Sequence, residues 1–144
     1  MILHGGLVAL RRQGFWRGAL ITGPSGAGKS DLALRALAAG FRLAADDRTL
    51  VWMSGGALYG RAPEPLADLI EVRGLGILRE TALPFAEIAL LAECVSGAAA
   101  IERMPEPEQI VIAEAPIPKL RIDPFEASAP AKLRRAIEYL GAAE

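Results

Sequence analysis

The residues best suited to chemistry in this chain form one glycine-rich run, residues 23–30, which reads GPSGAGKS. The run matches G-x-x-x-x-G-K-[ST], the phosphate-binding loop (P-loop) in which glycines let backbone N–H groups surround an anion. Lys29 is expected to reach the β- and γ-phosphates of a nucleotide, and the Ser30 hydroxyl is expected to hold Mg²⁺. The predicted nucleotide-binding residues are Gly23, Pro24, Ser25, Gly26, Ala27, Gly28, Lys29 and Ser30.

The alternative to a P-loop is a glycine-rich turn that ends in Lys-Ser without binding anything. An apolar run before the loop, residues 18–22, is typical of a buried strand, and residues 31–39 after it have the pattern of a helix that stops at Gly40. Strand, loop and helix therefore occur in the order that phosphate binding requires. The chain is predicted to bind a nucleoside triphosphate.

Two adjacent carboxylates, Asp46 and Asp47, follow at the end of an expected strand over residues 41–45. Ligand sites collect at this edge of open sheets. Neighbouring side chains on an extended chain point to opposite faces, so one carboxylate is free to face the nucleotide while the other binds a structural partner. The alternative is that both are turn residues. His4 is the only histidine, and its type suits proton handling, although such a residue near a terminus is more often simply solvated.

The segment 71–76, Glu-Val-Arg-Gly-Leu-Gly, places opposite charges on one face of an extended stretch and then frees the backbone with two glycines. As a plain strand with a surface ion pair, this segment would contribute little. As part of a site, Glu71 is suited to binding Mg²⁺ and Arg73 to contacting phosphate oxygens. The residues alone leave both interpretations open.

Strand patterns outnumber helix patterns in the chain, which predicts an α/β mixed-sheet P-loop domain. A polar turn over 11–14 joins the first two strands, and Ser128 is the expected N-cap of a final helix through Leu140. The expected strands cover residues 2–10, 18–22, 41–45, 49–53, 57–60, 87–93, 109–112 and 117–122, with a hairpin turn at 54–56 and a further turn at 62–65 before the segment 66–73.

Length and composition place the whole chain, residues 1–144, in one domain with a real core, since 52% of residues are hydrophobic. A net charge of −1 without a basic face disfavours nucleic acid as a partner. Charges or glycines interrupt every apolar run, which disfavours a membrane span. The start lacks the pattern of a signal peptide, and the single Cys94 is expected to fill the core in a reducing cytoplasm.

Taken together, these motifs resemble the catalytic domain of the HPr kinase/phosphorylase family. The resemblance rests on His4-Gly5, the loop 23–30, the segment 45–48 (Ala-Asp-Asp-Arg) and the segment 71–77 (Glu-Val-Arg-Gly-Leu-Gly-Ile), in the same order and with similar spacing. It covers residues 2–80 well. The Walker loop alone is unspecific, whereas its combination with the second signature is highly specific.

The resemblance implies a protein-serine kinase with a PEPCK-like P-loop fold that uses ATP and Mg²⁺ to phosphorylate a serine of HPr, the phosphocarrier of the sugar phosphotransferase system. It also implies a reverse phosphorolysis that releases pyrophosphate, and assembly as hexamers. The acidic pair would supply the carboxylate that accepts the serine proton, and His4 would stand beside that carboxylate and tune it. The implied catalytic residues are His4, Lys29, Asp46, Asp47 and Arg73, and the implied metal ligands are Ser30 and Glu71.

Two departures from the family pattern leave other functions open. The chain looks like the short forms, without an N-terminal domain, of alphaproteobacteria, and the family's later Pro-Gly-Arg-Asn segment has no clear counterpart. Lys119 and Arg121 are the candidates to supply its positive charge. A non-catalytic nucleotide sensor that binds a protein partner, or a small-metabolite kinase, are the alternatives, although no arginine-rich stretch is long enough for the lid of the latter.

Overall fold

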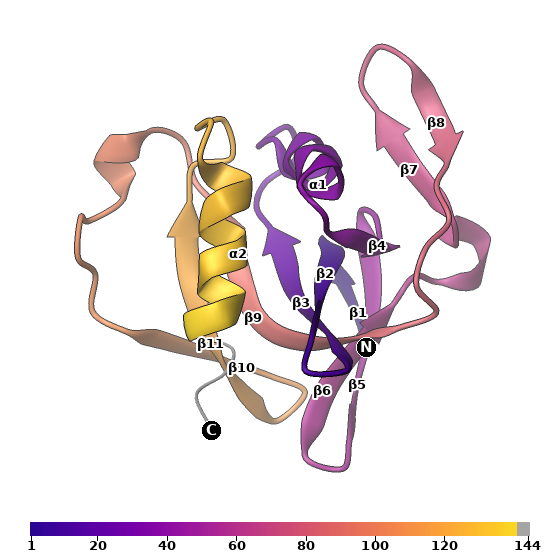
Figure 1. Ribbon diagram of the computed structural model, residues 1–144, viewed down its shortest axis with the longest axis horizontal. Coiled ribbons are helices and arrows are strands. Elements are labelled where there is room, and N and C mark those ends of the chain that lie inside the picture. Colours follow the sequence, from indigo (N-terminus) through magenta and orange to yellow (C-terminus); the bar gives the residue numbers. More distant parts are fainter. Residues whose placement is uncertain (141–144) are drawn as a thin grey trace.

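The computed structural model describes residues 1–140 and builds a mixed sheet with two α-helices (Figure 1). Within those residues, no helix is long and apolar enough to cross a membrane. The strands are β1 (Ile2–His4), β2 (Gly6–Arg12), β3 (Phe15–Thr22), β4 (Arg42–Ala45), β5 (Arg48–Ser54), β6 (Ala57–Arg61), β7 (Leu69–Val72), β8 (Gly76–Arg79), β9 (Ala86–Cys94), β10 (Glu108–Ile112) and β11 (Ala115–Ile122). The helices are α1 (Lys29–Ala38) and α2 (Ala129–Tyr139), with short 3-10 turns η1 (Glu64–Leu66) and η2 (Ala98–Ala100).

Nine of these strands form one sheet, in the order β1-β5-β6-β9-β3-β2-β4, with β11 joined to β9 and β10 joined to β11. Strands β3, β9 and β11 pair in parallel. Strand β2 is antiparallel to both β3 and β4, so β4 also runs parallel to β3. The carboxyl ends of β3, β4, β9 and β11 therefore lie at the same edge of the sheet, where ligand sites of α/β proteins form.

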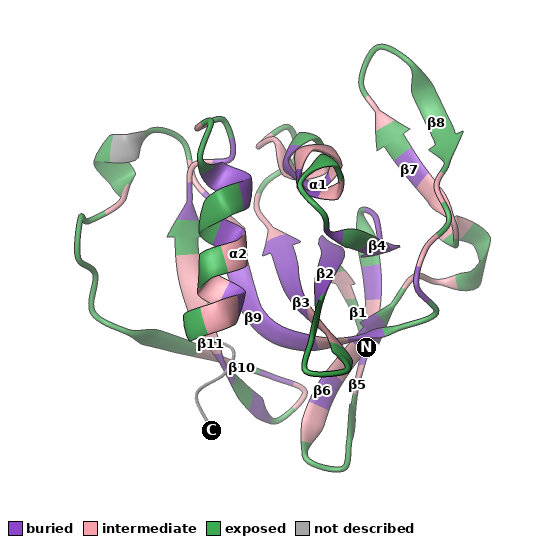
Figure 2. Cartoon of the chain, in the orientation of Figure 1, coloured by how far each residue is buried: buried purple, intermediate pink, exposed green. Residues whose placement is uncertain are grey.

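Both faces of the central strands are buried, which explains their nearly continuous apolar sequences. On one face, side chains such as Val8 and Ile21 pack beneath α1 and α2. On the other, Leu7 and Leu20 pack against residues of the β5–β6 and β10–β11 hairpins. Figure 2 shows the buried central strands beneath the two helices. The strands that carry the P-loop are thus held from both sides.

The mixed sheet with a P-loop helix and a C-terminal helix confirms the predicted fold class. The expected strand over 2–10 is broken at Gly5, where a Cβ would lie 2.5 Å from the Ile21 carbonyl oxygen. Residues 2–4 consequently form β1 and pair with β5 instead of continuing β2. The expected turn over 11–14 shrinks to Gln13-Gly14, both with positive φ, because a two-residue loop of this kind matches the twist of a hairpin.

Two further details come from the structure. The predicted turn before the segment 66–73 contains the 3-10 turn η1, and strand β7 begins at Leu69. Strand β8 was not predicted, because its residues are exposed and show no alternation of buried positions. Ser128 occupies the N-cap of α2 as predicted, but its side chain makes no capping hydrogen bond. The predicted hairpin over 49–60, the helix that stops at Gly40 and the strands over 87–93, 109–112 and 117–122 are confirmed to within a few residues.

Candidate active site

The P-loop connects the carboxyl end of β3 to the first turn of α1. Gly26 and Gly28 have φ of 79° and 101°, a left-handed conformation that glycine adopts without a Cβ penalty. The Ala27 N–H donates to the Pro24 carbonyl (3.0 Å), which closes the turn, and the helix begins at Lys29. The backbone N–H groups of a first helical turn lack partners within the helix and favour an anion. The loop thus leads into a helix start whose N–H groups favour an anion.

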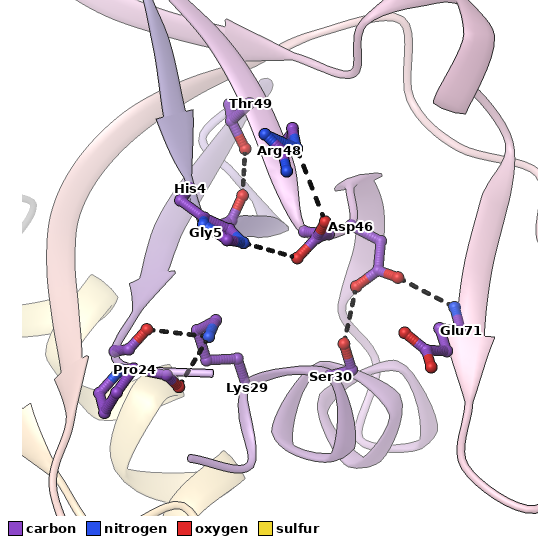
Figure 3. Close-up of polar contacts among 11 residues, drawn as sticks. His4, Gly5, Pro24, Lys29, Ser30, Asp46, Arg48, Thr49 and Glu71 are labelled. Atoms are coloured by element: carbon purple, nitrogen blue, oxygen red, sulfur yellow. Dashed lines mark hydrogen bonds and ion pairs between the residues drawn. The ribbon is translucent and has the colours of Figure 1, made fainter. Parts of the chain in front are cut away.

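The Lys29 side chain lies along its own loop. Its Nζ donates to the carbonyl oxygens of Gly23 (2.8 Å) and Pro24 (3.0 Å), as Figure 3 shows. Ala27 turns inward and packs against the core beneath the helices. The loop residues that line the adjoining cavity are Ser25, Gly26, Gly28, Lys29 and Ser30. The remaining three loop residues, Gly23, Pro24 and Ala27, do not line this cavity.

Asp46 is buried and ties the P-loop helix to β7. Its Oδ1 accepts a hydrogen bond from Ser30 Oγ (3.1 Å), and its Oδ2 accepts one from the Glu71 backbone N–H (2.9 Å). Burial raises the pKa of the Asp46 carboxyl above its ordinary value, although the two hydrogen bonds act in the opposite direction. This carboxylate therefore holds together three of the segments singled out from the sequence.

Asp47 points away from that network and into the cavity. Its φ is 67°, and the Arg48 N–H donates to the Asp46 carbonyl across it (2.7 Å), which makes a γ-turn of the rarer, strained kind. Asp47 Oδ1 lies 3.1 Å from His4 Nε2, and its Oδ2 lies 3.8 Å from Arg48 Nε. The two carboxylates diverge as predicted. They do so because Asp47 itself adopts a left-handed conformation, and not because the chain is extended here. Strain of this kind concentrates at functional sites.

His4 is brought to Asp47 by the short strand β1. His4 pairs with Arg48 in the register of β1 and β5, and the neighbouring Gly5 carbonyl accepts a hydrogen bond from the fully buried Thr49 hydroxyl (2.8 Å). Because β2 is antiparallel to β3, its first residue lies at the same edge as the P-loop. The His4 side chain remains exposed (59%), but its ring lies beside Asp47 at the sheet edge that carries the P-loop.

We expect Thr49→Val to lower the free energy of unfolding by about 1–3 kcal/mol, because it removes the donor of a buried hydrogen bond without changing side-chain shape. Urea unfolding of the two proteins measures the loss. The matched control is Thr81→Val, at an exposed threonine, which should change stability by less than about 0.5 kcal/mol. Equal stability of the two variants would contradict the role given to Thr49.

Glu71 and Arg73 belong to the β7–β8 hairpin, which stands beside α1 (Figure 1). The Leu75 N–H donates to the Val72 carbonyl (2.9 Å), and Gly74 takes φ of 90° at the third position of this turn, where glycine is preferred. The Glu71 and Arg73 side chains are exposed and line the cavity together with His4, Asp47 and the P-loop. Arg73 makes no ion pair within the described part of the chain.

These side chains surround one cavity of about 450 Å³. It gathers His4, Lys29, Ser30, Asp47, Glu71 and Arg73, which the sequence places as far as 69 positions apart. Asp46 stands immediately behind this lining, through its bond to Ser30. The cavity is also lined by Val72 of the segment 71–76 and by three residues that sequence reasoning did not single out, Asp31, Leu34 and Phe125. Phe125 follows β11, and only the parallel order of β3, β9 and β11 reveals that it reaches this edge.

Lys119 and Arg121 do not enter this cavity. Lys119 Nζ lies 3.5 Å from Glu93 Oε1, and Arg121 pairs with Glu93 and Glu108. Both line a separate hollow of about 590 Å³ between β11 and the end of α2. The prediction that one of them supplies positive charge beside the P-loop is therefore not supported by their positions.

The oxygen donors beside the P-loop fit a Mg²⁺ ion that arrives with a nucleotide. Across residues 1–140, no three His, Cys, Asp or Glu side chains converge as a ready metal cage. Mg²⁺ does not need one, since it usually takes one or two carboxylates and completes its shell with phosphates and water. The Ser30 hydroxyl, the buried Asp46 carboxylate and the Glu71 segment meet at one place, which fits that type of site.

We expect Asp46→Asn to stabilise the fold at neutral pH. A raised pKa means that folded Asp46 keeps its proton to higher pH than unfolded Asp46, so its stabilising contribution is complete below the ordinary pKa and is lost as pH rises through the raised pKa. Asparagine has no charge to bury and can still accept from the Glu71 N–H. Thermal unfolding should therefore show a higher midpoint for the variant at neutral pH, with the gap closing in acid. A variant less stable than wild type at neutral pH would contradict this.

Comparisons with known proteins identify the family and the fold of the chain. The family model of the HPr Serine kinase C-terminal domain matches residues 1–94. HPr kinase/phosphorylase of Stenotrophomonas maltophilia (strain K279a) is 47% identical over 79 residues, which cover 54% of this chain and 24% of that protein. The protein of the same name from Xanthomonas campestris pv. campestris (strain B100) is 53% identical over 62 residues, 42% of this chain and 20% of that protein.

The chain thus matches a quarter or less of the length of these curated relatives. A solved structure described as the Hpr(Ser) kinase/phosphatase from Coxiella burnetii superposes with a TM-score of 0.77. The superposition covers 96% of this chain and 88% of that chain at 20% sequence identity. At this identity the likeness establishes the fold.

Proposed function

The chain belongs to the family of the HPr serine kinase C-terminal domain, and on this premise we propose that it transfers the γ-phosphoryl group of ATP to a serine of the phosphocarrier protein HPr. The observation that supports the proposal most strongly is the convergence of a P-loop and an exposed, histidine-paired carboxylate, Asp47, on one cavity. Phosphoryl transfer needs a phosphate cradle and a group that handles the acceptor proton, and both stand side by side here.

The P-loop would bind the triphosphate of ATP. Its N–H groups and the start of α1 would hold phosphate oxygens, while Lys29 would exchange its contacts with the loop carbonyls for the β- and γ-phosphates. Ser30 and Glu71 would hold Mg²⁺, which when bound neutralises phosphate charge. Asp46 would act mainly by orienting the Ser30 hydroxyl.

Asp47 is the proposed general base. The serine Oγ would form a bond to the γ-phosphorus as the bond from that phosphorus to the β,γ-bridging oxygen breaks, which releases ADP. The serine proton would pass to Asp47, which is exposed to the cavity. His4, 3.1 Å from Asp47, would orient this carboxylate. Arg73, without an ion pair among the described residues, would contact the oxygens of the transferred group.

The same groups could run the reaction in reverse with inorganic phosphate as the acceptor. Protonated Asp47 would then return its proton to the serine oxygen as phosphate attacks phosphoserine and pyrophosphate forms. We propose the kinase direction as the principal one. The separation of Lys119 and Arg121 from the cavity gives the reverse direction less support.

The test is incubation of the purified protein with HPr, Mg²⁺ and ATP labelled in the γ-phosphate, followed by mapping of the label. Transfer to a serine is the expected result, and HPr with that serine replaced by alanine is the control. Binding of ATP without transfer would favour the alternative of a nucleotide sensor that acts through a protein partner. Failure to bind ATP would contradict the assignment of the P-loop itself.

We further propose that the chain acts as one kinase domain, in the cytoplasm, where a free buried thiol such as Cys94 persists. Self-association, by analogy with the family, is a related proposal. Light scattering after size-exclusion chromatography measures it, and a monomeric mass at working concentrations would contradict it.

A further inference from the structure

We propose that Phe125, in the β11–α2 connection, is the platform on which the purine base of the bound nucleotide stacks. The inference rests on the proposed nucleotide binding and extends it to a part of the chain outside every sequence motif. It assigns to this chain a base subsite on the side of the P-loop opposite to Asp47.

The order of strands determines in which direction the nucleoside must point. The P-loop follows β3, the carboxylates Asp46 and Asp47 follow β4, and Phe125 follows β11. Strand β4 lies two places from β3 on one side, across β2, and β11 lies two places away on the other, across β9. Figure 1 shows the same division, with β11 and α2 on one side of α1 and β4, β7 and β8 on the other.

The reacting phosphate must lie near Asp47, because that carboxylate takes the proton of the acceptor. The chain of phosphates then leads away from Asp47 across the start of α1, and the nucleoside leaves the loop on the β11 side. Phe125 is the aromatic residue that lines the cavity on that side. A purine at the end of the ribose would meet its ring.

Phe125 has the position and exposure of a stacking surface. A methyl group placed on Gly28 would lie 2.8 Å from Phe125 Cζ and 3.1 Å from the Pro124 ring, so the edge of Phe125 rests on the P-loop backbone. The residue nevertheless remains 67% exposed. An aromatic ring that rests on a phosphate-binding loop and leaves most of its area open offers a face to a heterocyclic base.

The connection that carries Phe125 is held by the P-loop helix itself. Arg35 of α1 donates to the carbonyl oxygens of Pro124 and Glu126, and it is fixed in turn by Asp31 (2.9 Å). The Phe125 N–H donates to Asp123 Oδ1 (3.0 Å). The platform is therefore ordered before any ligand binds, which reduces the entropy lost on binding.

The test compares a ligand that has a base with one that lacks it. Affinities of Mg²⁺·ADP and of Mg²⁺·tripolyphosphate are measured by titration calorimetry for wild type and for Phe125→Ala, Phe125→Trp and Phe15→Ala. Phe15 is the matched control because it is 69% exposed and lies at the opposite end of β3 from the P-loop. Thermal unfolding of each variant accompanies the titrations.

Phe125→Ala is expected to weaken ADP binding by about tenfold, in line with the loss of one base–aromatic stack, and to leave tripolyphosphate binding within about twofold. Phe125→Trp should restore ADP binding, and Phe15→Ala should alter neither affinity. Equal losses for both ligands, or no loss for ADP, would overturn the stacking role while the P-loop assignment stands. A wild-type protein that binds neither ligand would overturn the nucleotide site as a whole.

Discussion

Asp47→Asn is expected to lower the rate of phosphoryl transfer by about 10²–10⁴-fold, the usual contribution of a general base, with little change in ATP affinity. The amide cannot accept the serine proton. It can still occupy the left-handed conformation at φ of 67°, since asparagine tolerates this region as well as aspartate does. The fold should therefore survive, and single-turnover transfer to HPr measures the loss separately from nucleotide binding.

Asp68→Asn is the matched control for this experiment. Asp68 also has positive φ (60°), and its Oδ1 accepts a hydrogen bond from the Ala82 N–H (2.8 Å), which an amide oxygen can equally accept. It lies outside the lining of the cavity. Its replacement should leave transfer unchanged. A rate for Asp47→Asn within about threefold of wild type would remove Asp47 from the role of base and point to another acceptor of the proton.

Lys29→Ala is the second large effect, and we expect a loss of about 10²–10³-fold in transfer because the Lys29 ammonium group then no longer stabilises charge on the β- and γ-phosphates. Its two hydrogen bonds to loop carbonyls are partly exposed, so the variant should remain folded. Steady-state transfer to HPr measures the loss of activity, and thermal unfolding shows whether the variant remains folded.

Lys119→Ala provides a comparison at a lysine that lies in the separate hollow and pairs with Glu93. Its rate should equal that of wild type. If Lys29→Ala kept near-normal activity, the triphosphate would have to bind elsewhere, and the proposals for Asp47 and Phe125 would fail with it.

The P-loop could be predicted from sequence because all its determinants lie within about one strand, one loop and one helical turn. Glycines at 26 and 28, Lys29 and the helix stop at Gly40 act through local backbone geometry, which the structure reproduces. The strand patterns around them succeeded for a similar reason, since burial on both faces leaves an apolar run. Strand β8, which is exposed, left no such pattern.

The residues of the candidate site could be proposed from the sequence, but the separate role of each carboxylate could not. The local sequence could not distinguish the role of Asp46 from that of Asp47, because their different environments arise from residues far away in the chain. Asp46 is buried against Ser30 and the Glu71 backbone, while Asp47 turns toward His4 and the cavity. The charge of Lys119 and Arg121 suggested a role that their ion pairs with Glu93 and Glu108, and their place in a separate hollow, do not support.

By itself, the order of residues determined the phosphate-binding turn, the helix behind it and the acidic pair that ends the next strand, since each depends on neighbours a few positions away. Only the tertiary structure decided which carboxylate faces the cavity, that His4 stands beside it, and that Phe125 borders the opposite side of the loop. Those facts depend on the direction and lateral order of β2, β3, β4, β9 and β11, which arise from pairing between residues far apart in the chain.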